Sequence, residues 1–313
     1  MSEIIDAAKK PATRSFQDSS PLLEHPEQLR ARADKDGYLF FRGLFPIEKL
    51  ERLRLQILEI MQKWGLLDRS HECLAGIADY EAVNKLSAES VRIYGFPVEL
   101  YLEIQQLELF QAVAHDADVL HAFRTLFQAE PFPHPKTIAR VVLPHRDVHA
   151  TPPHQDFIHI QGTPVTWTAW FPLGDCPREL GGLSILEGSH RHGVIQVAAQ
   201  KGAGGLESIL CDMNLEWAEG DYKLGDAIIF SSHTVHKALP NAMGNQIRLS
   251  CDFRYQPEHM VIDPKSLQPH IPHSWEQIYE HWTDDTYKYY WRDKALTFSE
   301  WDETILWQKE KIC

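Results

Sequence analysis

The stretch GDAIIFSSHTVHKALPNAMGNQIRLSCDFRY, residues 225–255, decides the fold. Its last part alternates strictly. The even positions 248–254 read Arg, Ser, Asp and Arg, and the odd positions 249–255 read Leu, Cys, Phe and Tyr. Because successive side chains of a strand point to opposite faces, one face of this strand is polar and the other apolar. The pattern predicts a strand in a barrel wall, with its polar face lining a ligand cavity and its apolar face packed against helices.

Short β-like segments precede this strand. From residue 137 onward, runs rich in β-branched and aromatic residues are separated by Gly and Pro: TIARVVL, DFIHIQ, VTWTAWF, GLSIL and DAIIFSS. Several short strands with turn signals between them predict a sandwich or a small barrel. Residues 37–42, GYLFFR, predict one more short strand near the start of the chain.

Helical patterns flank the β-rich region on both sides. An amphipathic helix is predicted after Pro46, and its apolar stripe is Leu50, Leu53, Ile57, Ile60 and Trp64. Residues 97–114 predict a second helix, and 274–282 and 301–311 predict further helices. Residues 1–24 are polar and without periodicity, which predicts a flexible arm. We therefore expect a single domain over residues 25–313, mainly β, with its β core at about 137–256 and helical extensions at both ends.

Composition narrows the class of protein. A chain of 313 residues that is 43% hydrophobic can bury a full core. Its net charge of −13 argues against nucleic acid or an anionic membrane as the main partner. The 5 cysteines include no CxxC pair, which favours reduced thiols and a cytoplasmic location. No run of apolar residues approaches the length that a membrane-spanning helix needs. We expect a small-molecule substrate; the sequence gives no oligomeric state.

The tripeptide His154-Gln155-Asp156 is the most informative candidate site. If it ends a strand, residues i and i+2 share a face, so His154 and Asp156 can reach one point. His236 would complete a set of two histidines and one carboxylate, which is typical of oxygen-activating non-haem Fe(II). Short patterns of this kind often match by chance, and the alternative is that His154 caps a turn while Asp156 lies on the surface.

Arg248 and Ser250 lie on the polar face of the predicted strand. A guanidinium binds a carboxylate through two parallel hydrogen bonds, and a neighbouring hydroxyl adds another, so this pair suits a dicarboxylate near the metal. The alternative is a structural ion pair between Arg248 and an aspartate. His233 competes with His236 for the metal, because only one of two strand residues three apart can face it.

Several segments together resemble the phytanoyl-CoA dioxygenase family. They are HQD, VTWTAWFPLGDCPRELGGLSILEGSHRHG, GDAIIFSSHTVHKALPN and the R-x-S strand, which occur in the family's order over residues 137–256. DGYLFFRGLF, near the start, is similar to the family's opening strand. The resemblance implies a double-stranded β-helix of the jelly-roll, cupin-like type. It also implies an oxygenase that uses Fe(II), 2-oxoglutarate and O2, and that hydroxylates a metabolite while releasing succinate and CO2.

The same resemblance assigns roles to residues. It implies that His154, Asp156 and His236 bind the iron, and that Arg248 and Ser250 bind 2-oxoglutarate. The AlaLeuProAsn that follows His236 matches the family and favours it over His233. A family tryptophan in the cofactor pocket matches Trp170, for which a core role is an equal alternative. Arg140 is expected either to reach the cofactor or substrate or to lie on the surface. No catalytic side chain beyond the metal ligands is expected.

Other functions stay open at this point. One is a cupin-type metal-dependent isomerase or oxygenase that does not use 2-oxoglutarate. Another is a ligand-binding module on the same barrel, without catalysis. A third, a demethylase of nucleic acid or protein, is disfavoured by the net charge of −13. We expect substrate specificity to lie in residues 66–135 and in the C-terminal segment, and we expect a role in specialised metabolism.

Overall fold

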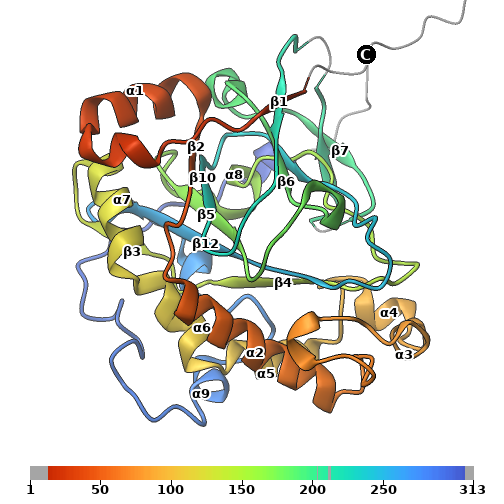
Figure 1. Ribbon diagram of the computed structural model, residues 1–313. Helices are drawn as coiled ribbons and strands as arrows, with labels where there is room; N and C mark the ends of the chain where they lie inside the picture. Colours follow the sequence, from red (N-terminus) through yellow and green to blue (C-terminus); the bar gives the residue numbers. More distant parts are fainter. Residues whose placement is uncertain (1–12, 203, 211–212, 307–313) are drawn as a thin grey trace, which may run out of the picture.

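The computed structural model describes residues 13–202, 204–210 and 213–306 (Figure 1). Its strands are β1 (Thr13–Ser15), β2 (Tyr38–Phe41), β3 (Pro131–Pro133), β4 (Ile138–Val142), β5 (Trp167–Pro172), β6 (Leu183–Leu186), β7 (Val197–Ala199), β8 (Leu206–Ser208), β9 (Trp217–Glu219), β10 (Ala227–Ser231), β11 (His236–Ala238) and β12 (Arg248–Pro257). Its α-helices are α1 (Pro26–Asp36), α2 (Ile47–Lys63), α3 (Tyr80–Asn84), α4 (Ala88–Val91), α5 (Val98–Gln105), α6 (Glu108–Ala112), α7 (Ala117–Phe127), α8 (Phe157–Ile160) and α9 (Trp275–Ile278).

Two sheets form the core. In the larger sheet the hydrogen-bonded order is β2, β10, β5, β12 and β3, and β4 also pairs with β12. In the smaller sheet the order is β1, β9, β6 and β11. Nearly all pairs are antiparallel; β1 with β9 is parallel. This architecture confirms the predicted double-stranded β-helix, a mainly β core with flanking helices.

Alternation along the larger sheet separates two environments. The apolar odd-numbered residues of β2, β5, β10 and β12, apart from Pro257, belong to one apolar cluster that they share with α1, α2, α5, α6 and α7. The even-numbered residues of the same strands face the smaller sheet, where apolar ones form a second cluster. The predicted alternation of β12 is confirmed, because its Leu249, Cys251, Phe253 and Tyr255 are all in the first cluster. In Figure 1, α2, α5 and α6 lie together on one side of the larger sheet.

The helix predicted after Pro46 is confirmed as α2, with Pro46 as its N-cap. The prediction of one helix over residues 97–114 is wrong. The chain forms α5 and then α6, because Leu107 takes an extended backbone conformation between them. The indole of Trp282 donates a hydrogen bond to the Gln106 carbonyl at 2.8 Å, so a tertiary contact satisfies a group that a continuous helix would use.

The ends of the chain also differ from expectation. Residues 13–24 belong to the fold rather than to an arm, because β1 pairs with β9 and a 3-10 helix covers Ser20–Glu24. Residues 1–12 lie outside the described residues. The helix predicted over 274–282 is confirmed only for the short α9. Of residues 301–311, Glu303–Leu306 form a 3-10 turn, and those from 307 onward lie outside the described part.

Two further expectations bear on the class of protein. In the described part of the chain, no helix is both long enough and apolar enough to span a bilayer. The thiols of Cys73, Cys176 and Cys251 are free, and the remaining two cysteines lie outside the described residues.

Candidate metal and cofactor site

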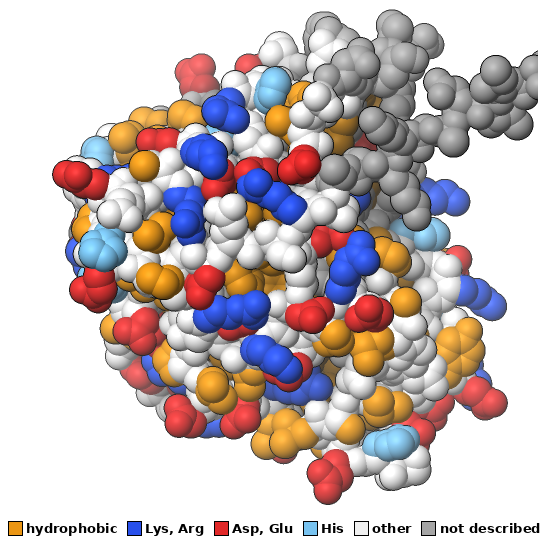
Figure 2. Space-filling view, turned by 45° about the horizontal axis from the view of Figure 1, so that its top comes forward, with side chains coloured by type: hydrophobic (Ala, Val, Ile, Leu, Met, Phe, Trp, Pro, Cys, Tyr) orange, Lys and Arg blue, Asp and Glu red, His pale blue; other side chains and the backbone are white. Residues whose placement is uncertain are grey.

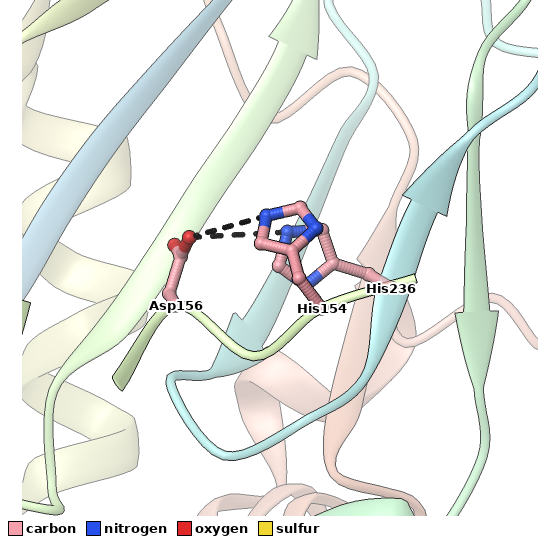
Figure 3. A group of neighbouring side chains, drawn as sticks. All are labelled: His154, Asp156 and His236. Atoms are coloured by element: carbon pink, nitrogen blue, oxygen red, sulfur yellow. Dashed lines mark ion pairs between the residues drawn. The ribbon is translucent and has the colours of Figure 1, made fainter. Parts of the chain in front are cut away.

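The side chains of His154, Asp156 and His236 converge, and their possible ligand atoms lie within 4.8 Å of one another (Figure 3). His154 and Asp156 come from the segment before α8, and His236 begins β11. Asp156 Oδ1 lies 3.8 Å from His154 Nε2 and 3.9 Å from His236 Nε2. All three side chains are buried. One ligand atom from each residue therefore faces a common point, as the sequence predicts for a metal centre.

Backbone carbonyls orient the two imidazoles. Nδ1–H of His154 donates to the Pro152 carbonyl at 2.8 Å, and Nδ1–H of His236 donates to the Thr234 carbonyl at 3.1 Å. A carbonyl oxygen only accepts, so each ring carries its proton on Nδ1 and presents the Nε2 lone pair to the centre. The two histidines also exchange backbone hydrogen bonds, which holds the segments together.

Asp156 is held by its outer oxygen. Thr168 Oγ1, on β5, donates to Asp156 Oδ2 at 2.6 Å, and Arg254 Nη2, on β12, donates to the same oxygen at 3.3 Å. Oδ1 is left to face the imidazoles. Neither role was predicted from the sequence. Thr168 is an even-numbered residue of VTWTAWF, like Trp170, and Arg254 is an even-numbered residue of its strand, like Arg248. Because alternate residues of a strand share a face, this numbering predicts that both side chains point into the barrel.

The local structure around the tripeptide differs from the prediction. DFIHIQ was predicted as a strand, but Phe157–Ile160 form the helical turn α8. Asp156 has helical backbone angles (φ −63, ψ −32), and the Phe157 amide donates to the Ser232 carbonyl. The side chains of His154 and Asp156 therefore converge across a bend instead of along one strand face. Gln155 fixes the bend, because its side chain bonds the backbone of Gly193, His233 and Ile195.

Burial and charge set the protonation of these groups. Burial lowers the pKa of His154 to about 3, and it also lowers the pKa of His236. Burial alone would raise the pKa of Asp156, but the Arg254 guanidinium opposes this, together with the two imidazoles and Thr168, so that pKa lies below its usual range. Neutral imidazoles and an ionised carboxylate are the forms that bind a metal.

Arg248 lies at the start of β12, buried beside Ser250 and Trp170. Its Nη1 donates to Ser250 Oγ at 2.9 Å, and its guanidinium carbon lies 5.7 Å from the centre of the Trp170 ring. Nε of Arg248 is buried and has no hydrogen-bond partner among the described residues. A buried guanidinium with an unsatisfied donor is costly unless a ligand accepts from it. These residues therefore fit the dicarboxylate that the sequence analysis expected.

The structure distinguishes the alternatives for the other candidates. In the described part of the chain Arg248 forms no ion pair, whereas Arg140 pairs with Asp252 at 2.6 Å. Trp170 is buried and packs edge-on against Tyr222, so it is a core residue that also borders Arg248. His233 does not join the ligands; its ring stacks on Phe157 at 4.2 Å.

Two adjoining cavities open beside the site. The first, of about 240 Å³, is lined by His154 and Asp156, and the second, of about 430 Å³, by Arg248. Arg140 lines both, as do Ile93, Tyr94 and Thr151. A substrate in the first cavity would lie against His154 and Asp156. Arg248 lines the second cavity and also two others, of about 710 and 330 Å³.

A double-stranded β-helix with two histidines and a carboxylate at one end defines the class of non-haem metal-dependent oxygenases. Within that class, the chain belongs to the phytanoyl-CoA dioxygenase family, whose model matches residues 33–249. It is an Fe(II)- and 2-oxoglutarate-dependent oxygenase, and its cofactors are Fe(II), 2-oxoglutarate and O2.

Curated relatives and solved structures are similar to this chain. It is 24% and 25% identical, over 260 residues, to the 1-deoxypentalenic acid 11-beta-hydroxylases of Streptomyces arenae and Streptomyces exfoliatus; the match covers 77% of this chain and 85% of each relative. The epimerase SnoN, solved with Fe3+, alpha ketoglutarate and nogalamycin RO, has a TM-score of 0.53 at 18% identity, covering 77% of this chain and 87% of SnoN. AviO1 from Streptomyces viridochromogenes Tue57 has a TM-score of 0.50 at 15% identity, covering 83% and 100%. At these identities the structures confirm the fold.

Proposed function

We propose that this enzyme hydroxylates an unactivated C–H bond of a small or medium-sized metabolite. The overall reaction consumes the metabolite, O2 and 2-oxoglutarate and yields the hydroxylated metabolite, succinate and CO2. The observation that carries the proposal is the buried set of His154, Asp156 and His236 beside a cavity of about 240 Å³. The curated relatives are named as hydroxylases of 1-deoxypentalenic acid, and these names support the same type of reaction.

Each residue of the site has a distinct role in this proposal. His154, Asp156 and His236 hold the iron, which supplies O2 activation when 2-oxoglutarate is bound. Arg248 and Ser250 bind the distal carboxylate of 2-oxoglutarate, and Trp170 forms the wall against which the guanidinium lies. Thr168 and Arg254 keep Asp156 Oδ1 directed at the metal. No side chain in this proposal acts as a general base.

Arg140 has a positioning role. Its ion pair with Asp252 fixes the guanidinium where the two cavities adjoin, and Arg140 lines both. We assign it to orienting the substrate and 2-oxoglutarate relative to each other rather than to binding the metal.

Anaerobic visible spectroscopy tests the binding half of the proposal. Metal-free protein receives Fe(II) and then 2-oxoglutarate, and a charge-transfer band is expected only when both are present. The band is expected to be lost in Asp156→Ala and to need far more 2-oxoglutarate in Arg248→Ala. If folded wild-type protein gives no band, the enzyme does not use 2-oxoglutarate, and a cupin-type reaction becomes the explanation.

Product analysis under 18O2 tests the hydroxylation itself. A hydroxylase places one 18O atom in the product and one in succinate. Succinate labelling with an unlabelled product would contradict hydroxylation and would indicate a hydrogen-abstraction outcome such as desaturation or epimerisation.

A further inference from the structure

The cavities at the site carry more positive charge than the rest of this acidic chain. Their Lys and Arg residues are Arg92, Lys136, Arg140, Lys201, Arg248 and Arg254, and their carboxylates are Asp147 and Asp156. The net charge of the whole chain is −13. On the face shown in Figure 2, Lys and Arg side chains are interspersed with Asp and Glu. The excess of cations is therefore a property of the cavities.

Three of these cations already have partners or a proposed ligand. Arg254 pairs with Asp156 at 3.3 Å, and Arg140 pairs with Asp252 at 2.6 Å. Arg248 is assigned to 2-oxoglutarate. The remaining cations are Arg92 and Lys201, which are exposed, and Lys136, which is half-buried.

Lys136 lines the same cavity as the metal ligands His154 and Asp156. Within the described part of the chain, no carboxylate lies within ion-pair distance of its ammonium group. Asp263 attracts it from farther away, while Arg254 and Lys265 repel it. Burial lowers the pKa of Lys136 to about 8, and Arg254 adds to that effect. An anion in this cavity would offset both the cost of burying the ammonium group and its repulsion by Arg254 and Lys265.

The position of Lys136 separates it from the cofactor. It precedes β4 at the end of the sheet where Arg254 lies, and the neighbouring His134 amide donates to the Arg254 carbonyl. Arg248 is six positions away from Arg254 along β12, which corresponds to roughly 20 Å of strand. A 2-oxoglutarate molecule held by Arg248 therefore does not reach Lys136, and the ammonium group can bind a second anion.

Part of the cavity wall is suited to an apolar body. Ile93, Tyr94, Tyr101, Ile138 and Ile160 line it together with Lys136. A single ammonium group is a point charge without the fork of a guanidinium, and no second unpaired cation lies beside it in this cavity among the described residues. This environment matches a monoanion such as a carboxylate better than a phosphate dianion.

We propose that the primary substrate is a carboxylic acid with an apolar carbon skeleton, whose carboxylate is bound by Lys136 while its hydrocarbon part lies against the metal ligands. This inference rests on the proposed function, since it names the substrate class of the same site. Lys136 is then a specificity-determining residue in the cavity of His154 and Asp156, whereas the 2-oxoglutarate anchor Arg248 lines the adjoining cavity.

Calorimetry with paired probes tests the inference. Enzyme loaded anaerobically with Fe(II) and saturating 2-oxoglutarate is titrated with octanoate and 1-adamantanecarboxylate, with the matching alcohols 1-octanol and 1-adamantanemethanol, and with octyl phosphate. We expect at least one acid to bind at least tenfold more tightly than its alcohol. Lys136→Met and Lys136→Gln are expected to abolish that preference, and Lys136→Arg is expected to retain it.

Lys201→Met is the matched control, because it removes the same charge from the exposed part of the adjoining cavity. It is expected to keep the acid preference. The inference is overturned if no acid binds, if acids and alcohols bind equally, if octyl phosphate binds most tightly, or if Lys201→Met removes the preference in place of the Lys136 variants. Two readouts on the wild type separate the proposals: a missing iron–2-oxoglutarate absorption band or an unlabelled product under 18O2 means that the proposed function fails, whereas failure of this inference leaves the band intact and removes only the preference for acids.

Discussion

The two faces of β12 differ in the kind of contact that their side chains make. On the outer face, Leu249, Cys251, Phe253 and Tyr255 share one apolar cluster with the helices, where each contacts several interchangeable neighbours. On the inner face, each polar residue has a specific partner: Arg248 with Ser250, Asp252 with Arg140, and Arg254 with Asp156. One strand thus contributes to stability on one side and, in the proposed function, to ligand binding on the other. Substitutions on the two faces should have separable effects.

Asp156→Ala should have the largest effect, and it acts on the inner network alone. It removes a metal ligand and leaves the Arg254 guanidinium buried without its carboxylate. We expect iron binding and activity to be lost, as measured by metal analysis after dialysis against iron. Asp252→Asn is the control, because it removes a carboxylate from the same face that does not meet the imidazoles. Loss of iron in Asp252→Asn as well would mean that the charge of the cavity, rather than the ligand, controls metal binding.

Phe253→Ala should break the outer face without affecting the inner one. Phe253 is fully buried, with ring centres 5.5 Å from Phe110 and 5.1 Å from Phe171. Removing such a ring typically costs about 3–5 kcal/mol of the free energy of unfolding, which denaturant titration measures. The folded fraction should bind Fe(II) and 2-oxoglutarate as tightly as the wild type. Weaker iron binding by fully folded Phe253→Ala would show that the two faces are coupled.

Arg248→Met should weaken 2-oxoglutarate binding about 100-fold, which is about 2.8 kcal/mol, while iron binding is retained. Methionine keeps much of the buried volume and removes the guanidinium that aims at the cavity. Titration of the charge-transfer band with 2-oxoglutarate measures the change. Ser250→Ala removes only the hydroxyl that accepts from Arg248, so it should weaken binding less. A larger effect for Ser250→Ala would contradict the assignment of Arg248 as the main anchor.

The sequence predicted the inner face of β12 because a strand repeats every two residues, and the pattern of charged and apolar residues is unambiguous there. It mispredicted α8, because the aromatic and β-branched residues of DFIHIQ are typical of a strand, whereas a tertiary hydrogen bond from the Phe157 amide to the Ser232 carbonyl turns the chain. The contacts that hold Asp156 could not be predicted from the residues next to it in the sequence. Thr168 and Arg254 are 12 and 98 positions from it along the chain, and only the packing of β5 beside β12 brings them together.

Thr168→Val should have the smallest effect of these substitutions, and its result is the most specific test of how Asp156 is held. It replaces one hydroxyl by a methyl of similar size, so the barrel keeps its packing while Asp156 Oδ2 retains only the Arg254 hydrogen bond. Loss of a group that orients a metal ligand typically weakens binding by at least tenfold, so we expect an increase of about tenfold in the Kd for Fe(II), or about 1.4 kcal/mol. Competition with a fluorescent chelator measures the affinity.

Thr166→Val is the matched control for that measurement. Thr166 is equally buried two residues earlier, but its hydroxyl donates to the Thr163 carbonyl and not to a metal ligand. Iron affinity should be unchanged in Thr166→Val even if its unfolding free energy falls. If both variants weaken iron binding equally, the effect comes from general disturbance of the barrel. If Thr168→Val alone does so, Thr168 raises the affinity for iron through its hydrogen bond to Asp156, without contacting the metal itself.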